Sequence, residues 1–173
     1  MATATQPTHV PLEVYLRTSY EPDAEFVDGV IEERPMGEYD HSSWQHAVEF
    51  WLAQHANEWG IRVRPELRIQ VSDRRFRVPD VTVLDRSLPV EQVITHPPIA
   101  VFEILSPEDS LNRIMTKLAD YERMGIRAII VLDPQGQHFR FISGRLEPLP
   151  TEPFDIPGSA CRFDLAEIEK LLD

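Results

Sequence analysis

The chain of 173 residues (19.9 kDa) carries one cysteine, Cys161, which excludes an internal disulfide framework and a multi-cysteine zinc site. Its formal net charge of −12 argues against a protein that coats nucleic acid non-specifically. The chain has no apolar run near the ~20 residues that span a bilayer and no basic or apolar start typical of a secretory signal, so we expect a soluble, cytoplasmic protein.

The size of the chain predicts a single domain over residues 1–173, with a flexible start at residues 1–11. The first elements we expect are a short helix over residues 12–19 and a β-hairpin over residues 24–33. Asp28-Gly29 lies between two β-prone runs, which is a strong hairpin signal. Apolar residues then recur at spacings of three and four, which predicts a helix over residues 41–59 between Asp40 as N-cap and Gly60 as C-cap.

Short strands are expected next, over residues 61–64, 67–71 and 76–84. Residues 99–105 read as a buried strand, residues 106–124 as a helix opened by a capping box at Ser106–Asp109, and residues 126–132 as another buried strand. This strand–helix–strand passage predicts a parallel pair of strands. A further strand over residues 137–142 and a C-terminal extension over residues 148–173, irregular but ending in a short helix, complete the chain.

Two acidic residues stand in apolar runs where a carboxylate is costly unless it is paired, hydrogen-bonded or bound to metal. Glu103 lies inside one predicted strand, and Asp80 opens the apolar part of another. If the two carboxylates converge to ~5 Å they repel by roughly 3 kcal/mol at an effective dielectric constant of about 20. A divalent cation or a shared proton would compensate this, and oxygen ligands favour Mg²⁺ or Mn²⁺ over zinc. The alternative is that Glu103 faces solvent or pairs with an arginine.

Basic residues supply two further candidates. Lys117 lies at the edge of the apolar face of its predicted helix, at nearly the level of Glu103, so its ammonium could reach that carboxylate; the alternative is a surface lysine with a buried stem. Residues 62–77 are rich in arginine on an otherwise acidic chain. This ribbon, and in particular Arg74, Arg75 and Arg77, is a candidate phosphate-contacting surface, against the alternative of a solvated hairpin.

Several short motifs, in order, resemble the Uma-type restriction endonuclease family of the PD-(D/E)xK nuclease superfamily. They are Glu25-Phe-Val-Asp-Gly29, His41 at a helix start, Arg77-Val-Pro-Asp-Val81, Phe102-Glu-Ile-Leu-Ser-Pro107, Lys117, Tyr121, Gly125 and Leu132-Asp-Pro134. The resemblance covers residues 13–134. It implies an α/β (α+β) fold with a restriction-endonuclease-like core, in which helices flank a central mixed β-sheet.

The resemblance also implies metal-dependent hydrolysis of phosphodiester bonds. Asp80 and Glu103 would then be the motif acids that hold Mg²⁺ or Mn²⁺, with help from the backbone carbonyl of Ile104. The lysine usual two residues after the glutamate is replaced by Leu105, and Lys117 matches the position on the following helix that the family commonly uses instead. Arg113 stands where many members have an aspartate.

Glu25 and His41 are supporting candidates for the same cleft, against the alternatives of a hairpin acid and a helix-start histidine.

The expected partner is DNA, and a homodimer is an open alternative. Another class of function also stays open. The chain could be a nuclease fold without catalysis that binds nucleic acid or a protein, which the acidic charge and Leu105 favour. A glycosidase that uses two carboxylates is a further alternative, but the sequence lacks the aromatic cues typical of sugar stacking.

Overall fold

The computed structural model describes residues 8–172, and its largest element is a six-stranded mixed β-sheet. Only β7 and β8 in this sheet run parallel; the other neighbouring pairs are antiparallel. The α4 helix (Leu111–Met124) joins β7 to β8, as the strand–helix–strand pattern predicts. The strand order is β10 (Arg145–Pro148), β9 (Phe139–Ile142), β8 (Ala128–Leu132), β7 (Ala100–Ile104), β6 (Val81–Asp85) and β3 (Ile61–Pro65).

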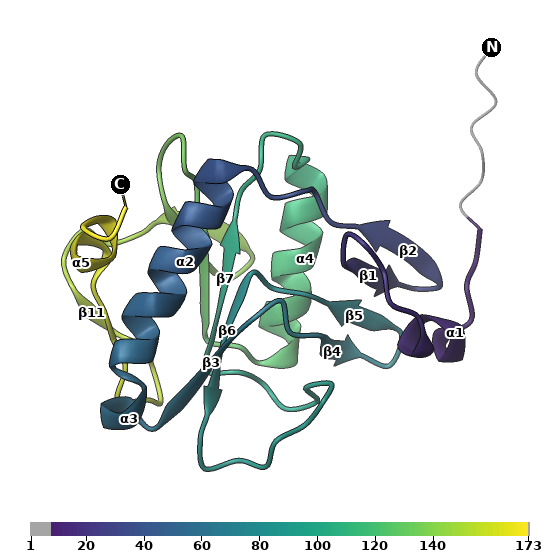
Figure 1. The fold of residues 1–173 in the computed structure, drawn as a ribbon, viewed down its shortest axis with the longest axis horizontal. Helices are drawn as coiled ribbons and strands as arrows, with labels where there is room; N and C mark the ends of the chain where they lie inside the picture. Colours follow the sequence, from purple (N-terminus) through teal and green to yellow (C-terminus); the bar gives the residue numbers. More distant parts are fainter. Residues whose placement is uncertain (1–7, 173) are drawn as a thin grey trace.

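Helices cover both faces of this sheet, with α2 (Tyr39–Gln54) and α4 on opposite sides of β7 (Figure 1). Side-chain alternation along the strands produces the two layers. Phe102 packs in the cluster that includes Trp51 of α2, whereas Val101 packs in the cluster that includes Leu118 of α4. Glu103 follows Phe102 and so points to the α4 side. The expected fold of a central mixed sheet flanked by helices is therefore confirmed.

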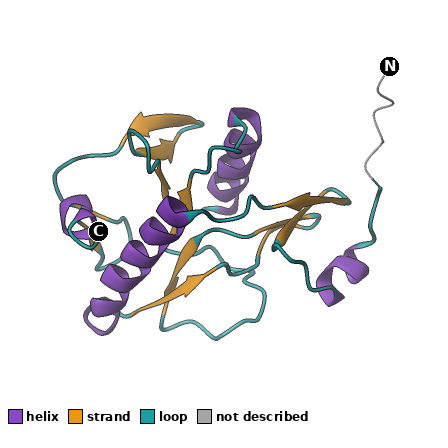
Figure 2. Ribbon diagram, turned by 45° about the horizontal axis from the view of Figure 1, so that its top comes forward, coloured by secondary structure: helices purple, strands orange, loops and turns teal. Residues whose placement is uncertain are grey.

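A second, four-stranded antiparallel sheet was not anticipated. Its order is β2 (Val30–Glu33), β1 (Ala24–Val27), β5 (Arg75–Arg77) and β4 (Ile69–Ser72). Figure 2 shows it on the side of the molecule where the described chain begins, near α1 (Leu12–Arg17). Tyr15 of α1 packs against Phe26 and Phe76 of this sheet. The predicted hairpin is confirmed as β1–β2, and both turn residues, Asp28 and Gly29, have positive φ, as a type I′ turn requires.

The strand expected over residues 76–84 is instead two strands in different sheets. β5 ends at Arg77 and β6 begins at Val81, because Pro79 has no N–H to donate to a ladder and the chain leaves the small sheet there. Asp80 thus lies at the junction of the two sheets.

Helix boundaries also differ from those expected. The helix predicted over residues 41–59 begins at Tyr39 after Glu38, not at an Asp40 cap, and breaks at His55 before the short α3 (Ala56–Trp59). Gly60 ends it in the left-handed conformation, as predicted. The Ser106–Asp109 box closes a turn in which Asp109 accepts from the Ser106 N–H (2.7 Å), and α4 starts later.

The C-terminal segment adds β10, the short β11–β12 pair (Phe154–Asp155 and Arg162–Phe163) and α5 (Leu165–Glu169). β10 was missed, and the final helix is shorter than expected. Ile156, Phe163 and Ile168 complete the core on the α2 side of the sheet. At the other end, residues 1–7 of the expected flexible start lie outside the described residues, while the Val10 N–H donates to the Gly29 carbonyl (2.8 Å). None of the helices within residues 8–172 has the length and apolar character needed to cross a membrane.

Candidate active site

The register of β6 and β7 brings Asp80 and Glu103 together. Val81 is paired with Phe102, so extending the pairing by one residue places Asp80 opposite Glu103. Side chains in such positions have Cβ atoms about 4.5–5.5 Å apart. Both are almost fully buried, at 3% and 4% exposed. The Ile104 N–H donates to Asp80 Oδ2 at 2.7 Å, which fixes the carboxylate against β7.

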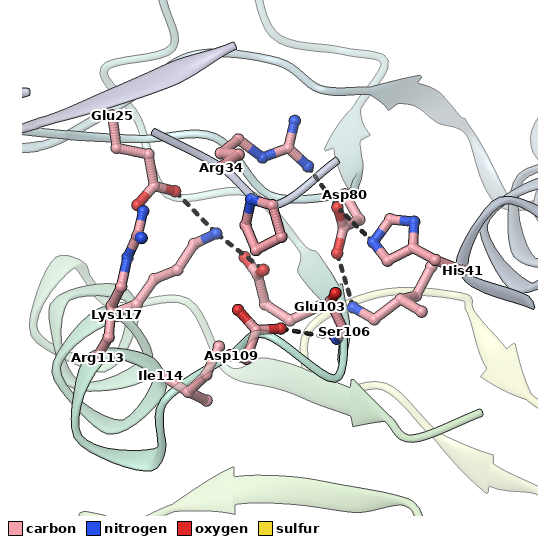
Figure 3. A pocket seen from close by; sticks show the side chains of 12 residues that line it. Glu25, Arg34, His41, Asp80, Glu103, Ser106, Asp109, Arg113, Ile114 and Lys117 are labelled. Atoms are coloured by element: carbon pink, nitrogen blue, oxygen red, sulfur yellow. Dashed lines mark hydrogen bonds and ion pairs between the residues drawn. The ribbon is translucent and has the colours of Figure 1, made fainter. Parts of the chain in front are cut away.

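Lys117 reaches the site from α4. Its ammonium nitrogen lies 2.8 Å from Glu103 Oε2 and 2.7 Å from Glu25 Oε1, and it also donates to the Val78 carbonyl at 3.2 Å (Figure 3). The side chain is buried, so the alternative of a surface lysine does not hold. Lys117 is the cation shared by two buried carboxylates.

Glu25 joins the site from β1 of the small sheet. Its Oε1 accepts the Val78 N–H at 2.9 Å and its Oε2 accepts from Arg77 at 3.0 Å. Tyr121 of α4 donates its hydroxyl to Glu103 Oε1 at 2.6 Å. The sequence pointed to Tyr121 as one of the motif residues but assigned its hydroxyl no partner, because an aromatic ring on an apolar helix face needs none.

Arg34 is the main residue that sequence reasoning missed. It follows β2 in a loop, where a charged residue next to a proline carries no special signal, yet its guanidinium donates to Asp80 Oδ1. His41, at the start of α2, brings its Nε2 to 3.3 Å from the same oxygen. Figure 3 shows both side chains pointing at Asp80. The acid pair therefore has three basic neighbours: Lys117, which the sequence placed within reach of Glu103, and Arg34 and His41 at Asp80.

These contacts separate the pKa values of the three acids. Burial alone would raise the pKa of Asp80, but the hydrogen bond from His41 and the charge of Arg34 hold it below its usual range. Burial is likewise outweighed at Glu25, whose pKa is lowered by Lys117 and Arg77. At Glu103 burial prevails over Lys117, and with the nearby charges of Asp80 and Glu25 it raises the pKa to about 7.

A pocket opens over this cluster. Its wall includes Ser106, Asp109, Arg113 and Ile114 in addition to the charged residues already described. Arg113 replaces the family's aspartate and brings a cation instead: it donates to the Glu33 carbonyl at 2.6 Å and lies 3.4 Å from Glu32. The pocket therefore presents carboxylates in its floor and guanidinium and ammonium groups around them.

The arginine ribbon divides into buried and exposed parts. Arg77 is 1% exposed and held by Glu25 and by Asp120 of α4 (2.7 Å), so its guanidinium does not face solvent and the prediction that it contacts phosphate is corrected. The cause is Asp120, a buried acid on α4 that draws the arginine inward. Arg75 is half-buried and paired with Asp28 and Asp120. Arg74 is exposed.

The donor set suits a hard divalent cation in type, because Asp80, Glu103 and the Ile104 carbonyl all offer oxygen. Within residues 8–172, no three His, Cys, Asp or Glu side chains gather around one position that could hold a metal ion. A metal would therefore rest on two carboxylates and backbone oxygen, with water completing its shell. It would also share those carboxylates with cations that the chain itself supplies.

Comparisons with known proteins agree with this architecture. Residues 12–154 match the sequence profile of the family described as "Uma2: Putative restriction endonuclease". The fold matches the crystal structure of "a putative nuclease belonging to DUF820" from Anabaena variabilis ATCC 29413, with a TM-score of 0.79, 20% identity, and coverage of 95% of this chain and 99% of that one.

A second solved structure, of a DrdV-DNA complex, aligns with a TM-score of 0.40 and 17% identity over 72% of this chain and 10% of that one, too weak a likeness to support an argument. A search of curated proteins finds no match.

Proposed function

We propose that this chain, which belongs to the Uma2 family, is a metal-dependent endonuclease that hydrolyses phosphodiester bonds in DNA. The observation that carries the proposal is the burial of Asp80, just before β6, and Glu103, on β7, in the wall of one pocket, with the Lys117 ammonium 2.8 Å from Glu103. Two acids and a lysine, buried together at the floor of a pocket, are the groups that phosphodiester hydrolysis requires.

Each residue has a role that follows from its position. Asp80, Glu103 and the Ile104 carbonyl would hold Mg²⁺ or Mn²⁺, which when bound polarises the phosphate and lowers the pKa of the attacking water. Lys117 keeps its charge in the buried site, since its two carboxylate partners raise its pKa against the effect of burial. It can therefore offer a proton donor and a positive charge to the phosphoryl oxygens.

Other residues support these groups or reach the substrate. Glu25 holds Lys117 from the side opposite Glu103, so it positions the ammonium. Arg113 at the pocket wall, with about a third of its side chain exposed, is placed to meet a phosphate, which guanidinium groups bind through paired hydrogen bonds. Exposed Arg74 and half-buried Arg75 extend the basic surface along the small sheet.

One observation favours a second candidate, a nuclease fold that binds without cleaving. Each of the three buried carboxylates already has a cationic partner from the chain itself: Arg34 for Asp80, and Lys117 for Glu25 and Glu103. The cluster is thus a closed ion-pair network, as a purely structural site would be.

A cleavage assay separates the two candidates. The full chain is incubated with plasmid, linear duplex and single-stranded DNA in Mn²⁺, Mg²⁺ or EDTA. We expect cleavage with the metals and none in EDTA. Asp80→Asn should lose activity by about a hundredfold or more, because it removes a carboxylate that would hold the metal. Glu108 is an exposed acid near the site, so Glu108→Gln is the matched control and should cleave at the wild-type rate.

Cleavage at the wild-type rate by folded Asp80→Asn would contradict the assigned site. DNA binding with no cleavage under any metal condition would establish the non-catalytic candidate instead.

A further inference from the structure

Arg34 bridges the floor and the mouth of the pocket. One guanidinium nitrogen donates to Asp80 Oδ1, while the other lies 3.5 Å from Glu66 and 3.9 Å from Asp23. The Arg34 side chain is only 10% exposed, whereas the Glu66 and Asp23 side chains are about half exposed. The guanidinium therefore has one deep carboxylate partner and two shallow ones.

Arg34 occupies one of the two Asp80 oxygens that could bind a metal, and it is the more crowded one. Asp80 Oδ2 is turned toward β7 and accepts the Ile104 N–H, and Oδ1 is shared by Arg34 and by His41 at 3.3 Å. A carboxylate oxygen has two lone pairs, so both positions on Oδ1 are taken by groups of this chain. A cation that binds Oδ1 must displace at least one of them.

Arg34 is the group whose release is compensated. When it leaves Asp80 it still faces Glu66 and Asp23, so its charge is not left unpaired. Lys117, in contrast, has two acidic partners that are both buried, Glu25 at 2.7 Å and Glu103 at 2.8 Å. Arg34 contacts Asp80 and the two outer acids at the same time, so it can release Asp80 and still keep carboxylate partners, as a residue that shifts between two positions requires.

We propose that Arg34 is a positioning residue that gates metal capture: it holds Asp80 in the metal-free protein and moves to Glu66 and Asp23 when a divalent cation binds. The inference rests on the proposed function, because it concerns the same acid pair. It assigns to Arg34 a role in binding that is separate from the hydrolytic step.

Calorimetric titration of the full chain with Mn²⁺ tests this directly. Arg34→Gln removes the competing cation, so we expect Mn²⁺ to bind about tenfold tighter than to wild type. Arg113→Gln is the matched control: it removes one positive charge from the same pocket, but its guanidinium contacts Glu32 and the Glu33 carbonyl and no proposed metal ligand. We expect the change in log Kd for Mn²⁺ in Arg113→Gln to be less than about a third of the change in Arg34→Gln.

Thermal unfolding supplies a second readout that does not depend on activity. In EDTA, Arg34→Gln should unfold at a lower temperature than wild type, because Asp80 keeps only His41 as a cationic partner. Mn²⁺ should raise the unfolding temperature of Arg34→Gln more than that of wild type, since metal takes the position that the guanidinium held. If Arg34→Gln does not fold, Arg34→Lys is used instead. We expect this variant to bind Mn²⁺ about two- to threefold more tightly than wild type, because lysine lacks the planar, paired donors of a guanidinium.

The outcomes are distinct. If the Arg34 and Arg113 variants gain the same affinity for Mn²⁺, the effect is one of general charge and the gate is overturned. An unchanged Mn²⁺ affinity in the Arg34 variants would also overturn it. In both cases metal binding itself, and with it the proposed function, would stand. Absence of Mn²⁺ binding in wild type and in every variant would overturn both the gate and the metal-dependent function.

Discussion

Replacing Glu103 by glutamine turns the electrostatics of the site into a measurable pH dependence. In the folded protein the pKa of Glu103 is raised from 4.5 to about 7, first by burial and then by Asp80 and Glu25, against the opposing effect of Lys117. The folded state therefore binds this proton more tightly than the unfolded state, and wild-type stability falls as pH rises from about 4.5 to 7. Glutamine has no such proton, and its amide oxygen can still accept from Tyr121.

The size of the effect follows from the shift. At about 1.4 kcal/mol per pKa unit, the cost of ionising Glu103 grows by about 2 to 3 kcal/mol between pH 5 and pH 8. Over that range Glu103→Gln should gain the same amount of stability relative to wild type, and at pH 8 in EDTA it should unfold no earlier than wild type. Urea unfolding of both proteins at several pH values measures the difference.

Glu108→Gln controls for the general effect of removing one acid, because Glu108 is exposed and close in sequence to the site. Its stability difference from wild type should stay flat between pH 5 and pH 8. If the Glu103→Gln difference is also flat, Glu103 does not titrate in this range and the reasoning from burial fails. If Glu103→Gln instead loses several kcal/mol at pH 8, Glu103 acts mainly as the ion-pair partner of Lys117.

Two further predictions concern the basic groups. Lys117→Ala should lower the free energy of unfolding by about 3 to 5 kcal/mol, because Glu25 and Glu103 lose their shared cation. Adding Glu103→Gln should restore part of the lost stability, and urea unfolding measures both effects. At low temperature, where part of it stays folded, Lys117→Ala should bind Mn²⁺ at least as tightly as wild type but cleave DNA about a hundredfold more slowly. If the variant cleaves DNA at the wild-type rate, the role assigned to Lys117 is wrong. Replacing Arg74 and Arg75 together by alanine should reduce the log–log salt slope of DNA binding by up to about 2, and an unchanged slope would place the phosphate contacts elsewhere.

The fold could be predicted from the sequence where local signals are strong. The Asp28-Gly29 turn, the apolar runs of β7 and β8 and the Gly60 and Gly125 helix ends all mark elements that the structure contains. The division of residues 76–84 between two sheets could not be predicted in the same way. Its β-prone residues fit one strand equally well, and only the docking of β5 beside β1 shows that the chain changes sheets at Pro79.

The same distinction applies to the site. Asp80 and Glu103 can be found from sequence because each is an acid in an apolar run. Lys117 can be found because it lies at the edge of an apolar helix face at nearly the level of Glu103, and the structure brings the three together. Arg34 interrupts nothing, since a charged loop residue is ordinary, and its contact with Asp80 depends on how the two sheets meet. Arg77 was misplaced for the converse reason: an arginine on a short strand normally faces solvent, and its burial depends on two buried acids far away in the sequence, Glu25 and Asp120.

The number of charges inside the protein bears on why this cluster exists. Four acids, Glu25, Asp80, Glu103 and Asp120, are buried with two bases, Arg77 and Lys117, and Arg34, whose side chain is 10% exposed, adds a third. Such networks are poor sources of stability, because the attraction barely offsets the loss of hydration, and apolar residues of similar volume often stabilise a fold more. The raised pKa of Glu103 shows that this compensation is incomplete at the centre of the cluster. The proposed function gives these features a reason: a divalent cation bound in the pocket would offset the cost of ionising Glu103, and Arg34 could release Asp80 while it keeps its contacts with the outer acids.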